Sequence, residues 1–156
     1  MSRTLRFDHI GITVRQLEPA IAFFESLGLA VEGRTVVEGD FIGTVTGIPN
    51  SRSEIVMLSI PGRPSGGAFT AIELSSFTRP EHMIGSVAPM ANEVGLRSVS
   101  FEVSDLDARV SELAADGYGL VGGIGEYDGG WRMAYVRGPE HIIVALAERE
   151  SGTPAH

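Results

Sequence analysis

The stretch Leu5-Arg6-Phe7-Asp8-His9-Ile10-Gly11-Ile12-Thr13-Val14 decides the fold, because an altered copy returns as Leu96-Arg97-Ser98-Val99-Ser100-Phe101-Glu102-Val103. Setting His9 on Ser98 gives an offset of 98 − 9 = 89, and the same offset carries Gly28 onto Gly117. A repeat of this kind predicts two copies of one supersecondary unit. The second copy has Ser98 where the first has His9, so any site that uses both copies is asymmetric.

The composition limits the class of protein and the chemistry open to it. The 156 residues are 43% hydrophobic and 21% charged, which is typical of one compact domain or two small fused modules. The absence of cysteine excludes disulfides, thiolate metal sites and a cysteine nucleophile. Any metal must therefore be held by His, Asp, Glu or backbone oxygen.

The charge of the chain bears on its partners. A formal net charge of −8 opposes attraction to nucleic acid or to anionic membranes. The sequence has no apolar run long enough to span a bilayer and no apolar signal region at its start, so we expect a cytoplasmic protein. An acidic surface suits a cationic ligand, but it is also a common way to stay soluble.

The first half of the chain predicts the order β-α-β-β-β. Apolar and polar residues alternate over Phe7–Val14, which indicates a strand with a helix over one face. The helix is expected over Leu17–Leu27 and ends at Gly28. Asp40–Ile48 fits either a short helix or a loop. The remaining strands are expected over Ala30–Val37, Glu54–Ile60 and Ala68–Ser75.

The second half repeats that order after a connecting segment. Residues 78–95 contain two prolines and two glycines with little periodicity, which indicates a linker. We predict a first module over residues 5–77, this linker, a second module over 96–148 and a polar tail over 149–156. The second module is expected to hold a helix over Leu106–Asp116, strands over Arg97–Val103, Trp131–Arg137 and Ile142–Ala147, a strand that starts at Tyr118, and a turn over Glu126–Gly130.

These features bring the chain close to a known family. From Leu5 to Glu148 it resembles the vicinal oxygen chelate superfamily, which includes glyoxalase I, methylmalonyl-CoA epimerase, extradiol dioxygenases, fosfomycin-resistance enzymes and bleomycin-binding proteins. The resemblance implies an α+β fold of two tandem βαβββ modules, each a half-barrel, paired around a cavity. It also implies a small-molecule ligand and a homodimer. The motifs that carry it are the opening strand, Phe23-Phe24-Glu25-Ser26-Leu27-Gly28-Leu29 and Tyr135-Val136-Arg137-Gly138-Pro139-Glu140.

The resemblance also implies where a metal would bind. Members of the family commonly hold a divalent ion with residues on the first and last strands of each module. Those positions are His9 and Glu73 in the first module, and Ser98 and Ala145 in the second. The implied cofactor is a divalent ion (Mn, Fe, Ni, Zn or Mg) with half of its ligands missing, so tight zinc or nickel binding is not expected. A metal-free His9–Glu73 pair that acts as a base stays open.

Other residues are candidates for the cavity. Ser100 and Glu102 share the strand parity of Ser98. Alternation along one later strand also groups Trp131, Tyr135 and Arg137 on one face. That face either lines the cavity or packs under a helix, because alternation does not say which face is inward.

Two classes of function remain. The first is an enzyme of the glyoxalase, epimerase or dioxygenase type, a metal-dependent lyase, isomerase or dioxygenase with a weakened metal site. The second is a metal-free binding protein that sequesters a small molecule, as bleomycin-resistance proteins do. Retention of His9 and Glu73 favours the first, whereas Ser98 and Ala145 favour the second. We favour the enzyme, because a binding protein has no evident need for a carboxylate among apolar strand residues. The sequence does not identify a substrate.

Overall fold

The computed structural model describes residue 3 and residues 9–62, 71–94, 96–127 and 130–150. Phe7 and Asp8 of the predicted first strand, residues 68–70 of the predicted fourth strand, and most of the predicted tail lie outside these ranges. The chain divides into two compact units, Met1–Ile84 and Gly85–His156. Each unit is described by itself.

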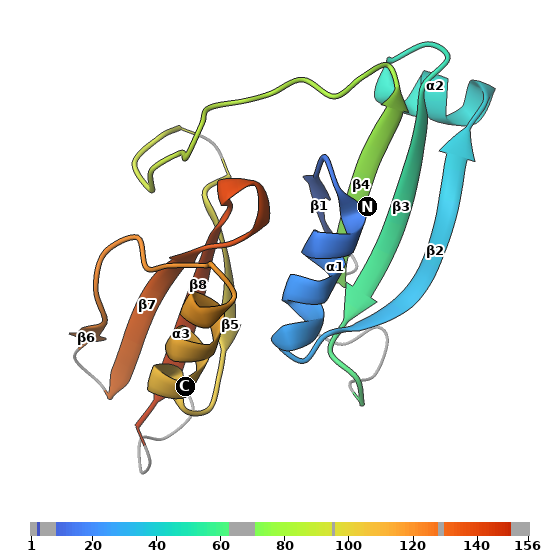
Figure 1. Ribbon diagram of the computed structural model, residues 1–156. Helices are drawn as coiled ribbons and strands as arrows, with labels where there is room; N and C mark the ends of the chain where they lie inside the picture. The colour runs from blue at the N-terminus through green and yellow to red at the C-terminus, as the bar shows by residue number, and fades with distance from the viewer. Residues whose placement is uncertain (1–2, 4–8, 63–70, 95, 128–129, 151–156) are drawn as a thin grey trace. The chain divides into compact units, whose positions relative to one another are not determined.

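The first unit is a four-stranded sheet with the strand order β1-β4-β3-β2 (Figure 1). The first strand pairs in parallel with the fourth, and the other neighbours are antiparallel. Its elements are β1 (His9–Thr13), α1 (Leu17–Ser26), β2 (Ala30–Glu38), α2 (Asp40–Thr46), β3 (Arg52–Ser59) and β4 (Ala71–Arg79).

Helix α1 covers one face of this sheet and forms the core of the unit with it. The helix buries Ile21 and Phe24 at helical spacing. The sheet buries side chains of one strand parity, Val56 and Leu58 on β3 and Ile72 and Leu74 on β4. Side chains of the opposite parity therefore lie on the other face, which we call the open face of the first sheet.

The second unit has the same architecture, with the strand order β5-β8-β7-β6. Its first and last strands are again parallel neighbours. The two units together confirm the predicted α+β fold of tandem βαβββ modules. The elements of the second unit are β5 (Ser98–Glu102), α3 (Leu106–Ala115), β6 (Gly125–Tyr127), β7 (Trp131–Arg137), the 3₁₀ turn η1 (Pro139–His141) and β8 (Ile143–Arg149).

The offset of 89 seen in the sequence holds in the structure. Helix α3 begins 106 − 17 = 89 residues after α1 and ends 115 − 26 = 89 residues after it. Gly28 and Gly117, also 89 apart, follow the two helices with φ values of +97° and +93°. Glycine adopts this left-handed conformation without a steric penalty, which explains why each helix stops there.

The strands that close each module share one register. Gly11 pairs with Glu73 in the first sheet, and Ser100 pairs with Ala145 in the second. The equivalent positions on the last strands, Glu73 and Ala145, are 145 − 73 = 72 residues apart, whereas the first strands are 89 residues apart. The segment from first to last strand is therefore 89 − 72 = 17 residues shorter in the second module than in the first. The first module therefore carries its extra residues, α2 among them, between its first and last strands.

One predicted strand is different in the structure. The strand expected to start at Tyr118 is reduced to an isolated bridge between Leu120 and Val136. The next strand is instead β6, which overlaps the turn predicted from Glu126. Gly122 and Gly123 explain the difference, because glycine has no side chain to pack and weakens a strand interior.

An arginine ties the first turn of each helix to its sheet. Arg34 Nη2 lies 2.5 Å from Glu18 Oε1 in the first unit, and Arg132 Nη1 lies 2.8 Å from Asp107 Oδ2 in the second. The two acidic residues are repeat equivalents, because 107 − 18 = 89. Both modules therefore contain an ion pair between the first helical turn and the sheet, although Arg34 lies on β2 and Arg132 on β7.

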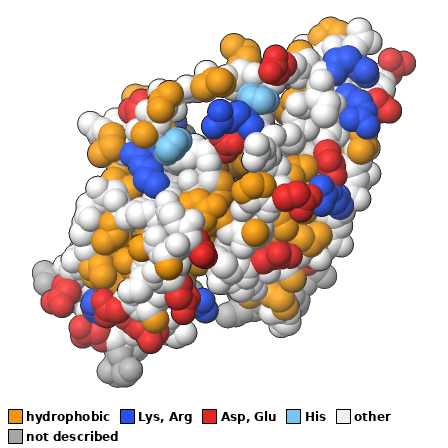
Figure 2. Space-filling view, in the orientation of Figure 1, with side chains coloured by type: hydrophobic (Ala, Val, Ile, Leu, Met, Phe, Trp, Pro, Cys, Tyr) orange, Lys and Arg blue, Asp and Glu red, His pale blue; other side chains and the backbone are white. Residues whose placement is uncertain are grey.

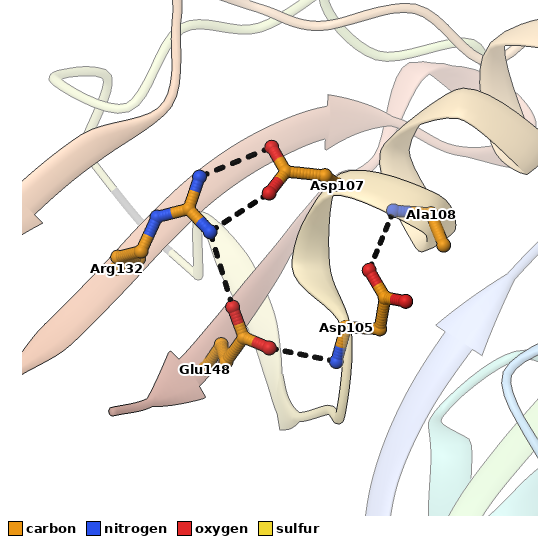
Figure 3. Close-up of polar contacts among 5 residues, drawn as sticks. All are labelled: Asp105, Asp107, Ala108, Arg132 and Glu148. Atoms are coloured by element: carbon orange, nitrogen blue, oxygen red, sulfur yellow. Dashed lines mark hydrogen bonds and ion pairs between the residues drawn. The ribbon is translucent and has the colours of Figure 1, made fainter. Parts of the chain in front are cut away.

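The second of these ties belongs to a larger network (Figure 3). Arg132 binds both oxygens of Asp107, at 2.8 and 3.0 Å, and its Nη1 also lies 3.2 Å from Glu148. Glu148 in turn accepts the backbone N–H of Asp105, whose own side chain caps α3 at Ala108 N. Bidentate arginine–carboxylate pairs of this kind fix geometry as well as charge.

We expect the network to make the stability of the second unit fall in acid. The hydrogen bond from Arg132 holds the pKa of Asp107 below its ordinary value of 3.8. Because the pKa is lower in the folded chain, the stabilisation is present above the unfolded pKa and is lost as pH falls through the folded one. Urea midpoints followed by the fluorescence of Trp131 should fall more steeply below pH 3.8 in the natural chain than in Asp107→Asn.

The control is Asp116→Asn, at the other end of α3. It removes the same charge from the same helix without touching Arg132, so its acid dependence should match that of the natural chain. An Asp107→Asn curve that is parallel to the natural one would contradict the assignment.

Candidate functional site

The site is built around His9 and Glu73 on the open face of the first sheet. His9 begins β1 and Glu73 lies on the parallel neighbour β4. His9 Nε2 lies 3.6 Å from Glu73 Oε2, and their side chains are 36% and 28% exposed. A few residues along the same two strands, Thr13 Oγ1 and Ser75 Oγ lie 3.3 Å apart. The structure thus places an imidazole and a carboxylate side by side in a position that solvent reaches.

The second sheet has the same positions with different side chains. In the register of β5 and β8, Ser98 and Ala145 stand in the same relation as His9 and Glu73. Ala145 is buried, with Ser100 opposite it on β5 and Tyr135 opposite it on β7. This position is therefore part of a packed sheet surface without any donor group for a metal.

The donor set decides which metal chemistry is open to the chain. In the part of the chain that the structure describes, no three His, Asp or Glu side chains gather closely enough to hold a metal ion. His9 and Glu73 supply two donors, whereas catalytic zinc sites normally have three protein ligands. Two donors suit only an ion that keeps most of its water, as Mg²⁺ does. The residues present do not fit a tight zinc or nickel centre.

The structure shows which face Trp131 and Tyr135 occupy. Their neighbour Arg132 reaches Asp107 on α3, so it lies on the helix side of β7. Successive side chains alternate between faces, so Trp131, Tyr135 and Arg137 lie on the side away from α3. Ala134 and Val136, of the same parity as Arg132, are buried accordingly. The alternative that these aromatic residues pack under the helix is therefore wrong.

Glu102 and Trp131 meet through Arg149 on this side of the second sheet, away from α3. Arg149 Nε lies 3.7 Å from Glu102 Oε1, and its guanidinium carbon lies 4.6 Å from the centre of the Trp131 ring. The arrangement combines an ion pair with a cation–π contact. Glu102 is thus engaged with an arginine of its own sheet.

Arg137 holds a backbone segment. Its guanidinium donates to the backbone oxygens of Pro89, Ala88 and His141, the last two at 3.3 and 3.0 Å. It also contacts Met90 Sδ at 3.1 Å. These contacts anchor residues 88–90 to the end of β7, which gives Arg137 a structural use that the sequence did not indicate.

The open face of the first sheet carries a second carboxylate that the sequence analysis missed. Ser59 Oγ donates a short hydrogen bond to Glu32 Oε1. The strand β2 has a register shift between Val31 and Gly33, so Glu32 is an extra residue there. A glycine inside a strand pattern often marks such a bulge, and Gly33 was the available signal.

Comparison with known proteins agrees with this architecture. The sequence profile described as "Glyoxalase/Bleomycin resistance protein/Dioxygenase superfamily" matches residues 8–135. A glyoxalase family protein from Bacillus cereus is 39% identical, with a TM-score of 0.88 over 96% of this chain and 97% of that one. No curated protein sequence matches the chain.

Two characterised proteins share the fold at lower identity. Trypanothione-dependent glyoxalase I from Leishmania major is 19% identical, with a TM-score of 0.59 over 94% of this chain and 87% of that one. A fosfomycin resistance protein from Listeria monocytogenes, in complex with Mn(II) and sulfate, is 13% identical, with a TM-score of 0.54 over 98% of both chains. At this identity the likeness concerns the fold alone. The profile match and the Bacillus protein establish the family, and the chain belongs to the glyoxalase, bleomycin resistance protein and dioxygenase superfamily, also called the vicinal oxygen chelate superfamily.

Proposed function

We propose that the chain is a small-molecule enzyme of the glyoxalase and epimerase type, in which Glu73 moves a proton next to a substrate carbonyl. The observation that supports this most directly is the 3.6 Å approach of His9 Nε2 to Glu73 Oε2 on an open sheet face. A carboxylate in reach of solvent, oriented by an imidazole, is suited to general base catalysis. The chain has neither lysine nor cysteine, so carboxylates and histidines are the main candidates for the base.

The proposed step is an enolisation. Glu73 accepts the proton from a carbon beside the carbonyl, the C–H electron pair forms the new C=C bond, and the carbonyl π pair moves onto oxygen. Return of the proton to either face of the same carbon completes an epimerisation. Its return to the former carbonyl carbon, while the hydroxyl proton moves from one oxygen to the other, completes an isomerisation. His9 lies beside the carboxylate and helps to position it, and the substrate is a molecule with two adjacent oxygens.

A loosely held divalent ion is part of this proposal. His9 and Glu73 would supply two ligands and the substrate oxygens would supply others. When bound, such an ion would polarise the substrate carbonyl. The Mn(II) complex of the fosfomycin resistance protein shows that a protein of this fold can bind such an ion.

A homodimer is also part of the proposal. The connecting segment carries several large apolar side chains in exposed positions, and exposed apolar patches often mark protein interfaces. A solution mass of twice 16.6 kDa would support a dimer, and a mass of 16.6 kDa would contradict it. These exposed side chains are Met83, Ile84, Val87, Met90 and Val94, and Leu96 at the start of the second module is exposed as well.

A metal-free binding protein is the second candidate. The observation that favours it is the pair Ser98 and Ala145, which occupy the positions of His9 and Glu73 in the second sheet without offering strong metal donors. Such a protein would use the same open faces to sequester a small molecule and would leave that molecule unchanged.

One experiment separates the enzyme from the binding protein. It measures both proton exchange in a test substrate and the binding of metal ions. Hydroxyacetone, which has a carbonyl next to a hydroxyl, is incubated with the full chain in D₂O, and deuterium uptake at its hydroxymethyl carbon is followed by proton NMR. We expect catalysed uptake, raised by Mn²⁺, while Zn²⁺ and Ni²⁺ bind too weakly to remain after gel filtration. An uptake rate equal to that in buffer, with and without Mn²⁺, would favour the binding protein. Stoichiometric zinc after purification would show that the metal site has ligands beyond His9 and Glu73.

A further inference from the structure

Strand β2 carries a bulge that directs one carboxylate toward the proposed site. Val31 pairs with Leu58 and Gly33 with Met57, so Glu32 has no partner of its own in the ladder. Bulges of this kind re-aim side chains and are common next to active sites. The hydrogen bond that Glu32 accepts from Ser59 Oγ shows which way this carboxylate turns.

The carboxylate turns onto the face that holds His9 and Glu73. Leu58 is buried on the α1 side, so its neighbours Met57 and Ser59 face away from the helix. Met57 lies directly opposite Glu73 on β4. Ser59 is therefore a diagonal neighbour of Glu73, and such positions are about 7–8 Å apart. Glu32, bonded to Ser59, joins Glu73 on the open face.

Two glycines lie beside these groups, on the two edge strands of the sheet. Gly11 lies opposite Glu73 on β1, and Gly33 lies opposite Met57 on β2. Among the residues that the structure describes, a Cβ atom added at either glycine would meet no atom within 4 Å. The open face therefore has room for a ligand above both glycines, while Met57 lies between Glu73 and Gly33 in the same row of the sheet.

The arginines of this sheet are bound elsewhere. The chain has twelve basic residues and all are arginine. Three of these arginines lie in the four strands of the first sheet. One of them, Arg34, forms ion pairs with Glu54 and with Glu18 of α1. The other two, Arg52 and Arg79, share Glu38 at the far end of β2.

Acidic and basic side chains are interspersed over the face of the molecule seen in Figure 2. Within the described strands of the first unit, two carboxylates without an arginine of their strands make a locally negative site. A negative site attracts cations and repels anions, most strongly where water is partly excluded.

We propose that Glu32 is a specificity-determining residue of the His9–Glu73 site, and that the site takes substrates that carry an ammonium group near their paired oxygens. The inference rests on the proposed function for the location of the site. Glu32 attracts the ammonium group, and its hydrogen bond from Ser59 fixes where that group lies. A substrate with a carboxylate or phosphate in the same place is repelled.

The test uses three probes of nearly equal size and different charge. 1-Aminopropan-2-ol is a cation, propane-1,2-diol is neutral and lactate is an anion. Each is titrated into the full, isotope-labelled chain at neutral pH and constant ionic strength, and the ring resonances of His9 report binding. We expect the amine to bind about threefold or more tightly than the diol, and lactate to bind most weakly.

The variant Glu32→Gln keeps an oxygen acceptor for Ser59 and removes the charge. The affinity for the amine should fall to that for the diol, while the affinity for the diol stays the same. Glu38→Gln is the matched control, because it removes the same charge from the same strand six residues away, about 20 Å along it. It should leave the order of the probes unchanged, because charges at that distance are screened by salt.

Several outcomes would overturn the inference. These are failure of the amine to shift His9, lactate binding as tightly as the amine, and a preference that survives Glu32→Gln. A preference that Glu38→Gln weakens equally would assign it to the net charge of −8 instead of Glu32. None of the probes needs to react, so a chain with proton exchange but no charge preference contradicts only this inference. A chain with the preference but no exchange contradicts only the proposed enzyme.

Discussion

Replacing Glu73 with glutamine should lower the rate of deuterium uptake into hydroxyacetone by about 10²- to 10⁴-fold, the usual contribution of a positioned general base. The amide has nearly the same shape as the carboxylate but cannot accept the proton. Because the Glu73 side chain is 28% exposed, the substitution leaves no deeply buried charge unpaired, and the fold should survive. Proton NMR in D₂O, with rates taken at several concentrations of hydroxyacetone, measures the effect.

Two further variants make the result specific. His9→Ala leaves the carboxylate in place but removes the group that orients it, so we expect a smaller loss, on the order of 10²-fold at most. Glu38→Gln changes the same sheet by the same charge, and its rate should equal that of the natural chain. Uptake in Glu73→Gln at the natural rate would show that another group takes the proton.

Truncating Phe24 to alanine should destabilise the first unit by about 3–5 kcal/mol, the usual cost of removing a buried phenylalanine ring. Phe24 is fully buried, and its ring packs edge-on against Phe23 with centroids 5.2 Å apart. The loss combines the transfer of apolar surface with the cavity left under α1. Urea unfolding followed by far-UV circular dichroism measures it.

The matched control is Phe41→Ala on α2. Phe41 is 76% exposed, so its removal should change stability by no more than about 0.5 kcal/mol. The single tryptophan, Trp131, lies in the second unit, so its fluorescence separates that unit from the first. A loss below about 1 kcal/mol in Phe24→Ala would mean that the helix repacks around the vacated space.

Much of the fold follows from local sequence patterns that occur in both modules. Alternation in the first strand, helical spacing from Leu17 and a stop at Gly28 each recur 89 residues later, and the structure repeats them at that offset. These signals act within a few residues of the chain, so they can be seen without tertiary structure. The second strand of the second module was misplaced because its glycine-rich segment carries no such pattern.

The sequence also determined which side chains stand at equivalent places in the two modules. Hydrophobic alternation sets the register of a strand, since a slip of one residue would turn every buried side chain outward. His9 and Glu73 therefore correspond to Ser98 and Ala145, and the structure pairs their strands in the same register. The asymmetry between the modules is thus a property of the sequence itself.

Only the tertiary structure decided how the other polar residues are used. It brought Glu32 onto the open face through a bulge, and it engaged Arg137 with the backbone of residues 88–90. It also turned Trp131 and Tyr135 away from α3. Each outcome depends on contacts between segments far apart in the chain, and the strand period alone does not say which face a partner will cover. For this protein, repetition in the sequence determined the framework and its paired positions, whereas contacts across strands determined which charged side chains lie on each sheet face.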